Sequence, residues 1–242
     1  MMKKKSFPQS DTAVSEALGF IIILGIIMIS MSALWASSGP IIENLQTGTH
    51  FQEMANSFKI IHKNINRVVF DEAPSRISEL VIKDGTMTIS QGSTFTIDNI
   101  TYPMGSIAYH LDENSVAYEG GGLWTKYKDN SVMQYAPSIS ISNNRPVIIV
   151  VCTSGNTSIG GEGLVRISIS SSVGTHIPNT TSNTTIVVQS DYYKAWERYF
   201  IDTLGLLNTT SNSETQNVTA NFSDIGVTSI TYKVKVISAR VL

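Results

Sequence analysis

The stretch Ala17–Ala36, ALGFIIILGIIMISMSALWA, carries no charged side chain and is the longest apolar run in the sequence. An α-helix rises about 1.5 Å per residue, so a run of this length spans the roughly 30 Å hydrocarbon core of a bilayer. Trp35 lies near its end, where an interfacial aromatic anchor is expected. The pattern therefore predicts a transmembrane helix over residues 14–36, preceded by a cytoplasmic leader over residues 1–13.

Charges on either side of this run predict its orientation. Lys3, Lys4 and Lys5 precede it, and the next basic residue is Lys59. Because basic residues stay on the cytoplasmic side, we expect the N-terminus to lie in the cytoplasm. The part of the chain that follows the membrane helix should then lie outside the cell. The alternative is a cleaved secretory signal ending near Ala36, but the apolar part of such signals is only about 7–15 residues long. The length therefore favours a retained single-pass anchor.

Composition limits the function classes for the rest of the chain. Of 242 residues, 42% are hydrophobic and only 15% are charged, and the formal net charge is −2. This near-neutral balance, without a Lys/Arg stripe, predicts no nucleic-acid partner. The single cysteine, Cys152, cannot form an intrachain disulfide. Core packing, ions or neighbouring chains must therefore stabilise the exported part.

Apolar residues continue at helical spacing beyond the membrane segment. From Ile41 to Val68 they recur mostly every three or four positions, which predicts an amphipathic helix. This helical stalk covers residues 37–70. Gly39 and Pro40 leave two interpretations open, either one long helix that is weakened there or two helices separated by a loop.

Residues 71–242 have the pattern of an extracytoplasmic β-rich domain. Asp84-Gly85, between two alternating runs, predicts a tight hairpin. Its buried face should carry Leu80, Ile82, Met87 and Ile89. Runs bounded by turn residues predict strands within 77–90 and at 93–97, 106–110, 116–118, 138–142, 147–153, 164–170, 184–189 and 227–237.

Two of these runs predict different degrees of burial. The run 147–152, VIIVVC, is continuously apolar, which predicts a central strand buried on both faces with Cys152 as a small hydrophobe. The run 227–237 alternates apolar residues with Lys233 and Lys235, which predicts a strand with one face in water.

One helix is expected among the strands, over residues 192–204. Ser190 or Asp191 can cap it, and Gly205 lies just past its end. Its aromatic stripe around Trp196 is typical of a helix face packed in the core. The expected fold class is α+β: a long N-terminal transmembrane and amphipathic helix followed by an antiparallel β-sandwich-like domain with one packed helix.

Motifs for catalysis or cofactor binding are not found in the sequence. The four histidines are far apart, and none has a neighbour at metal-ligand spacing. The glycine runs at 120–122 and 160–163 are typical of turns, because no strand-loop-helix pattern surrounds them. We therefore expect no catalytic residue, no metal site and no cofactor, and we expect that the protein is not an enzyme.

The residues leading into the apolar run carry a family resemblance. The segment 11–20, DTAVSEALGF, resembles the opening of archaeal type IV pilin-like proteins, in which a short leader precedes an A-V-S block. The resemblance implies cleavage by a prepilin-type peptidase near Ala13 and Val14, with the helix retained. Thr12 and Glu16 differ from the basic residue and the proline that many members carry there.

Three later segments extend this resemblance over most of the chain. They look like blocks in a group of uncharacterised archaeal pilin-like surface proteins, and they are 73–76 (APSR), 118–124 (YEGGGLW) and 192–200 (YYKAWERYF). That group has no established activity, so these blocks indicate family alone.

The resemblance implies a structural protein of the archaeal cell surface, a pilin-like subunit or minor pilin. Its helix would leave the membrane lipid and associate with other copies or with other pilin-like subunits. Gly19 and Gly25 would allow close helix approach. Glu16 has two interpretations, because it could lie at the lipid interface or pair with an amine in a filament core.

Two other function classes stay open. A static anchor would remain in the membrane and bind an S-layer, an adhesin or an archaellum-stator partner through its β-rich domain. A membrane-tethered solute-binding protein or enzyme would need a polar pocket, which one sequence does not reveal.

Sequons for N-glycosylation, Asn-x-Ser/Thr, all follow the predicted membrane helix. They predict a glycoprotein decorated on solvent-facing turns, with acceptor residues at Asn99, Asn156, Asn179, Asn183, Asn208, Asn217 and Asn221.

Overall fold

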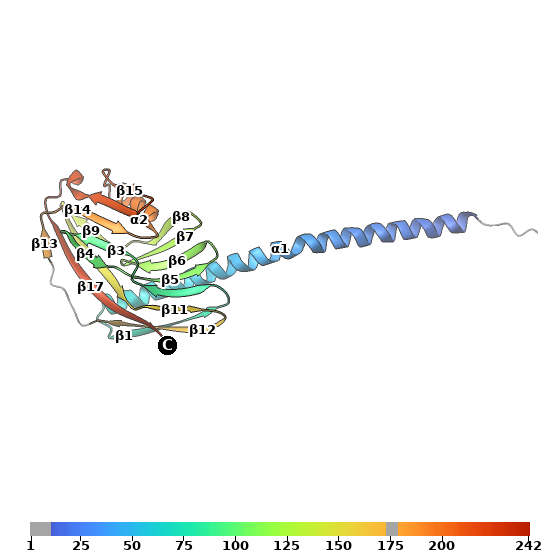
Figure 1. Ribbon diagram of the computed structural model, residues 1–242, viewed down its shortest axis with the longest axis horizontal. Helices are drawn as coiled ribbons and strands as arrows, with labels where there is room; N and C mark the ends of the chain where they lie inside the picture. Colours follow the sequence, from blue (N-terminus) through green and yellow to red (C-terminus); the bar gives the residue numbers. More distant parts are fainter. Residues whose placement is uncertain (1–10, 173–178) are drawn as a thin grey trace, which may run out of the picture. The chain divides into compact units, whose positions relative to one another are not determined.

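The computed structural model in Figure 1 describes residues 11–172 and 179–242, without the side chains of residues 11–16, 39–44 and 179. The chain forms two compact units, Met1–Thr49 and His50–Leu242. The first helix, α1 (Asp11–Val69), is continuous through residues 39 and 40. Of the two interpretations of the stalk, the structure therefore supports a single helix.

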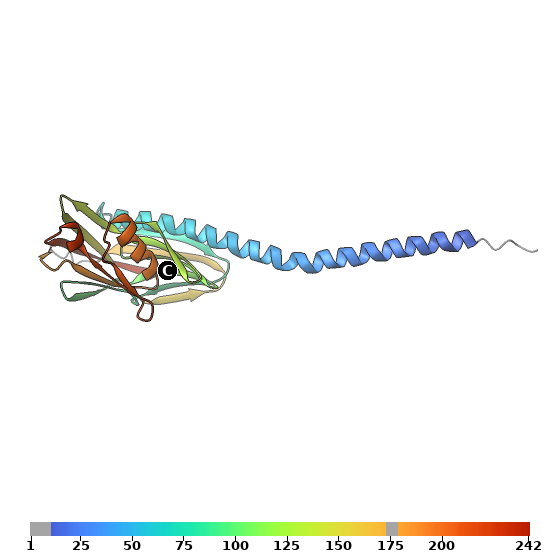
Figure 2. The same cartoon turned by 90° about the horizontal axis from the view of Figure 1, so that it is seen from above.

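The second unit begins with residues 50–69 of α1, which form one wall of a hydrophobic core. Apolar side chains at three- and four-residue steps are buried there, as predicted for an amphipathic helix. They are Phe51, Met54, Phe58, Ile61, Ile65 and Val68. Figure 2 shows this part of the helix lying along the strands of the same unit.

Three sheets make up the rest of the second unit. Sheet A has the order β1 (Ser75–Ile82), β12 (Gly163–Ser171), β17 (Ile230–Val241), β10 (Arg145–Ser154) and β9 (Ser138–Ser142), with β13 (Asn179–Thr181) also paired to β17. Sheet B has the order β11 (Thr157–Gly160), β2 (Thr86–Ser90), β5 (Ser106–Leu111), β6 (Asn114–Glu119), β7 (Gly122–Tyr127) and β8 (Asn130–Tyr135). Sheet C has the order β15 (Thr210–Asn212), β16 (Asn217–Asn221), β14 (Thr185–Gln189), β3 (Thr94–Ile97) and β4 (Ile100–Pro103). The fold class is α+β, as predicted, with mostly antiparallel sheets.

The strands around Asp84-Gly85 do not form the predicted hairpin. β1 pairs with β12 in sheet A, whereas β2 pairs with β5 and β11 in sheet B. The turn instead takes the chain from one sheet to another, with Gly85 at φ +83°. The predicted burial is confirmed, since four apolar side chains on either side of the turn lie in one core: Leu80, Ile82, Met87 and Ile89.

Two hydrophobic cores meet at sheet A. The first lies between residues 50–69 of α1 and strands of sheets A and B, and the second surrounds α2 (Tyr193–Arg198). β17 contributes to both, because Val234 lies in the second core and Ile237 in the first. Lys235, expected on a wet face, is half-buried and its Nζ donates a 2.9 Å hydrogen bond to the carbonyl of Val69.

The strand β10 is central in sheet A, between β17 and β9, as its apolar sequence predicts. It pairs with β17 in parallel, which an alternating pattern alone does not reveal. Cys152 is buried, but Val147 is 43% exposed, so the prediction that both faces are buried is wrong at that end.

The helix predicted over residues 192–204 is present as α2 followed by a π-helical turn over Tyr199–Thr203. Trp196 and Phe200 are buried in the second core, as predicted. The predicted cap is wrong, because the residue before the helix is Tyr192 and its own side chain forms no capping hydrogen bond.

Candidate functional site

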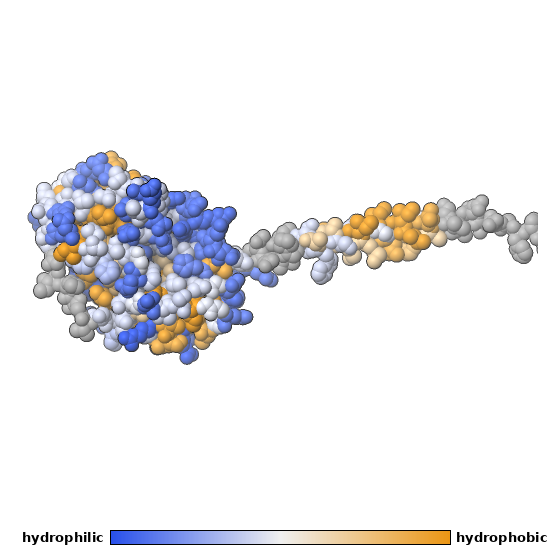
Figure 3. All heavy atoms as spheres, viewed as in Figure 1, coloured by the Kyte–Doolittle hydropathy of each residue, from blue (hydrophilic) through white to orange (hydrophobic). Residues whose placement is uncertain are grey.

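The apolar part of α1 is the first candidate site. Its Ala17–Ser38 span has a mean hydropathy of 2.6, is long enough to cross a membrane, and buries none of its most apolar window within the chain. Trp35 is 82% exposed, and an added Cβ at Gly19 or Gly25 would meet no atom within 4 Å. Figure 3 shows this segment as a hydrophobic surface. A helix of this length and composition can span a membrane or act as a signal sequence.

The residues predicted for leader cleavage lie at the start of α1. The backbone of Ala13 and Val14 is helical, and so is that of Glu16. Their side chains, and all of residues 1–10, lie outside the part of the chain that the structure describes. The roles predicted for these three residues therefore stay predictions.

A second candidate site lies in the β domain, where two sequence blocks meet. Glu119 ends β6, and Gly120-Gly121 forms a two-residue turn into β7 with φ of +62° and +92°. Both values suit the tight turns that join twisted antiparallel strands. An added Cβ at Gly120 would collide with the side chains of Met104 and Trp196, so only glycine allows α2 to approach this turn.

The carboxyl of Glu119 is the centre of this site and is only 2% exposed. Its Oε1 accepts hydrogen bonds from Ser190 Oγ at 2.6 Å and Trp196 Nε1 at 3.1 Å. Its backbone oxygen accepts a third, from Trp124 Nε1 at 3.0 Å. The two indole rings lie 4.5 Å apart, centroid to centroid. These four residues, the Glu119 cluster, attach the segment before and within α2 to sheet B.

Hydroxyl groups of sheet B complete the attachment of α2. Ser131 Oγ accepts from the backbone N–H of Ala195 at 2.9 Å, and Ser115 Oγ shares a 2.9 Å hydrogen bond with Tyr192 Oη. Ser131 of the neighbouring sheet thus satisfies one helix N-terminal N–H that a local cap would otherwise satisfy. Ser190, predicted as a cap, instead accepts from the N–H of Tyr192 at 2.9 Å while donating to Glu119.

Burial raises the pKa of Glu119 to about 7, because a carboxylate loses hydration there. Ser93 Oγ lies close enough to oppose this shift, yet it is buried without a hydrogen bond of good geometry. Glu119 also borders a polar cavity of about 130 Å³, which is lined by Ser90, Ser106 and Asp191 among others. Burial therefore favours the protonated carboxyl of Glu119 up to a higher pH than for an exposed glutamate.

Metal-ligating or nucleophilic chemistry finds no support at this site. Within residues 11–172 and 179–242, no group of three or more His, Cys, Asp or Glu side chains could hold a metal ion. Burial raises the pKa of Cys152 to about 12, which leaves its thiol protonated and a poor nucleophile. His176 lies outside the described residues.

The seven predicted glycosylation acceptors differ in accessibility. Asn99, Asn156 and Asn208 are exposed, and Asn183, Asn217 and Asn221 are half-buried. Asn221 Oδ1 accepts hydrogen bonds from Thr184 Oγ1 and from the N–H of Ser223, both at 3.0 Å. The side chain of Asn179 lies outside the described part of the chain.

Two comparisons with known proteins found matches that cover most of the chain. A family described as a family of unknown function (DUF7289) matches residues 12–240, from the start of the apolar helix to the last strand. An uncharacterized protein of Archaeoglobus fulgidus is 23% identical over an alignment of 210 residues, and the match covers 64% of this chain and 69% of that protein. No solved structure matches.

Proposed function

The chain belongs to this family of unknown function, and from its own anatomy we propose that it is a non-enzymatic, pilin-like structural protein of the cell surface. In this proposal, α1 anchors each newly made copy in the membrane and later packs against the helices of other copies. The β domain lies outside the cell and forms the outer layer of the assembly.

One observation carries the proposal, the exposure of the Ala17–Ser38 span. A helix with mean hydropathy 2.6 that buries none of that window in its own chain must be covered by something else. Lipid covers it before assembly, and neighbouring helices would cover it afterwards. Gly19 and Gly25, with open space at their Cβ positions, would allow those helices to approach closely.

Further support comes from the charge pattern and the N-terminal block. Basic residues at positions 3–5, with none between them and Lys59, favour a cytoplasmic N-terminus. The resemblance of residues 11–20 to pilin-like leaders implies a prepilin-type peptidase as the first partner. The sequons imply a glycan-bearing outer surface, which could contact an S-layer.

The mature N-terminus of the native, membrane-extracted protein tests this proposal. We expect peptide mass spectrometry to find a first residue near Val14, with the apolar helix retained. An intact residue 1 or 2 would replace the filament proposal with a static anchor that binds a surface partner. A first residue near Gly39 would mean a secreted protein and would overturn the membrane assignment.

A matched pair of variants strengthens the test. Processing by a prepilin-type peptidase depends on residues at the cleavage site, so Val14→Pro should leave the leader attached. Ser10→Ala, four residues upstream of that position, should be processed like the natural chain. Equal processing of both variants would argue against this class of peptidase.

A further inference from the structure

A basic groove runs beside the last turns of α1. Lys59, Lys63 and Arg67 recur at four-residue steps, which places them on one face of the helix. Together with Ile60, Phe70 and Tyr135 they line a depression of about 870 Å³ between the helix and the end of β8. These six residues are called the basic groove below.

The apolar residues of the basic groove are exposed. Ile60 is 60% exposed and Phe70 is 41% exposed. Tyr135 is 44% exposed and stacks on His62, with ring centroids 4.8 Å apart and an interplanar angle of 18°. Exposed aliphatic and aromatic side chains surrounded by positive charge have the composition of a protein interface, with an apolar centre and a polar rim.

The basic side chains of the groove have no acidic partner among the described residues, although Lys59 Nζ donates a 2.9 Å hydrogen bond to Asn56 Oδ1. Among the described residues, no carboxylate forms an ion pair with the groove's Lys59, Lys63 or Arg67. Asp71 borders the same depression. The three cations therefore leave the groove with a net positive charge.

An acidic surface lies elsewhere on the same domain. Asp112 and Glu113 occupy the turn between β5 and β6, Asp129 occupies the turn between β7 and β8, and Asp191 precedes α2. These four residues, the acidic rim, border a depression of about 460 Å³ that also contains Lys126 and Lys128. Four carboxylates lie beside three ammonium groups there, because Lys194 Nζ also donates a 2.7 Å hydrogen bond to the backbone oxygen of Asp129. The ion pair between Lys128 and Glu113, at 3.9 Å, is highly exposed.

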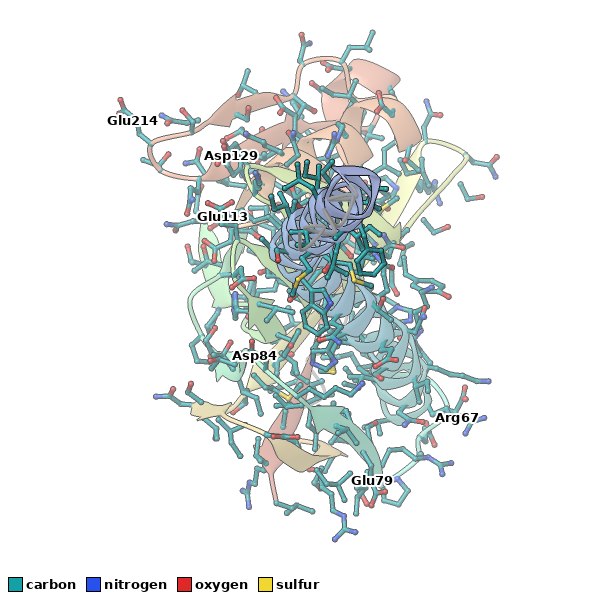
Figure 4. The ribbon with its side chains drawn as sticks, turned by 90° about the vertical axis from the view of Figure 1, so that its right-hand side faces the viewer. Arg67, Glu79, Asp84, Glu113, Asp129 and Glu214 are labelled. Carbon is teal, nitrogen blue, oxygen red and sulfur yellow. The ribbon has the colours of Figure 1, made fainter. Side chains whose placement is uncertain are left out.

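The basic groove and the acidic rim cannot meet within one chain. Figure 4 places Arg67 on one side of the β domain and Glu113 and Asp129 on the other. A groove and a rim of opposite charge on different sides of one subunit can pair only between copies. A contact of this kind uses two different patches, so it repeats along an open assembly unless the geometry closes a ring.

We propose that the basic groove of one copy binds the acidic rim of the next copy. Complementary charge orients the two β domains, and the exposed apolar residues of the groove become buried against the neighbour. This inference rests on the proposed function, because a head-to-tail contact between β domains is useful to a subunit that assembles in series.

Charge exchange between the two surfaces tests the contact in the full-length protein in its own membrane. The groove variant is Lys59→Glu with Lys63→Glu, and the rim variant is Glu113→Lys with Asp129→Lys. All four side chains are exposed, so the domain should remain folded, which protease resistance would confirm. The measured quantity is the fraction of chains captured as dimers by a short amine-independent, photoactivated cross-linker.

We expect each variant alone to lower the dimer fraction by about tenfold, because like charges then face each other. A chain carrying all four changes should regain at least about half of the natural dimer fraction, since both signs are exchanged. The control reversals Arg240→Glu and Glu162→Lys, at exposed positions outside both surfaces, should change nothing. A groove variant that dimerises normally would overturn the inference, and so would a fourfold variant that stays as low as the two parents.

Filament recovery from the same cells separates this inference from the proposed function. If dimers follow the charge exchange but no filaments are sheared from cells making the natural chain, the contact stands and the filament proposal falls. If filaments form equally well from the natural chain and from both single-surface variants, the filament proposal stands and the contact falls.

Discussion

The indole Nε1 of Trp196 donates a 3.1 Å hydrogen bond to Oε1 of Glu119 in the interior of the β domain. The same oxygen accepts from Ser190 Oγ, so the donors come from α2 and from the segment just before it. A titratable group therefore attaches α2 to sheet B in the interior of the domain. This arrangement links the stability of the domain to pH.

Stability should fall as pH rises through the range between the unfolded and folded pKa of Glu119. The ordinary pKa of the carboxyl is 4.5, and burial raises it to about 7 in the folded chain. Between these values the folded chain keeps a proton that the unfolded chain has released, so rising pH favours unfolding. Glu119→Gln keeps an acceptor at Oε1 but does not titrate. This variant should therefore remove the fall in stability with rising pH.

Urea unfolding of the detergent-solubilised protein at pH 5 and pH 7.5 measures this effect. The comparison uses the difference between the natural chain and the variant, because burial lowers the pKa of His62 and His110 and gives an opposite slope. The exposed control Glu162→Gln should leave the pH dependence unchanged. An equal slope for the natural chain and Glu119→Gln would show that Glu119 does not titrate in this range.

The hydrogen bond and the ring packing of Trp196 should be separable. Trp196→Phe removes the Nε1 donor but keeps most of the aromatic contact with Trp124, so it should cost about 1–3 kcal/mol of the free energy of unfolding. Trp196→Ala also leaves a cavity in the second core and should cost about 3–5 kcal/mol. Denaturant titration measures both values. The idea fails if Trp196→Phe is as stable as the natural chain while Trp196→Ala is damaged, because packing alone would then explain the role of this residue.

Periodicity predicted burial better than strand pairing. Leu80, Ile82, Met87 and Ile89 are buried as expected, yet their two strands lie in different sheets. An Asp-Gly pair determines a sharp turn, but the partners of each strand depend on distant segments that the local pattern does not contain. The parallel pairing of β10 with β17 is non-local in the same way.

Short polar strands and the buried cluster were harder to predict. β8, β15 and β16 were not expected, because runs rich in Asn, Ser and Thr also suit loops. Glu119 was part of a recognised block, but a single glutamate beside glycines is usually a surface residue. The sequence did contain a signal for this buried glutamate, namely the indole of Trp124 five residues later and the segment Tyr-Tyr-Lys-Ala-Trp. These two segments are far apart in the sequence and meet only in the folded chain.

The turn at Gly85 should tolerate substitution less well than a turn with similar backbone geometry. Gly85 and Gly161 have φ of +83° and +99°, and both conformations disfavour other residues. An added Cβ at Gly85 would overlap the carbonyl oxygen of His110, whereas Gly161 has open space. We expect Gly161→Ala to cost roughly 1–2 kcal/mol and Gly85→Ala roughly 3–5 kcal/mol.

Thermal unfolding of the two alanine variants beside the natural chain measures this difference. Equal losses would mean that backbone conformation alone limits both positions and that the sheet-to-sheet turn has room to adjust. A larger loss at Gly85 than at Gly161 would support the role of Gly85 in bringing β2 against β5 while β1 joins the other sheet.

Glycan occupancy should follow the accessibility of each acceptor. The amide of Asn156 lies on an exposed residue with no hydrogen bond to its side chain among the described residues, so a glycosyltransferase can reach it in the folded domain. The side chain of Asn221 is half-buried, and its Oδ1 accepts hydrogen bonds from Thr184 Oγ1 and from the N–H of Ser223. Glycopeptide mass spectrometry of the native protein should therefore find higher occupancy at Asn156 than at Asn221.

Removal of each acceptor provides the matching control. Asn156→Gln should lower the glycan mass of the folded protein and leave its stability unchanged, because a surface amide is lost. Asn221→Gln should leave the glycan mass unchanged and destabilise the domain by about 1 kcal/mol, because the N–H of Ser223 loses its acceptor. Equal occupancy at Asn221 and Asn156 would contradict this prediction and would mean that glycosylation precedes folding, since an unfolded chain presents both acceptors freely.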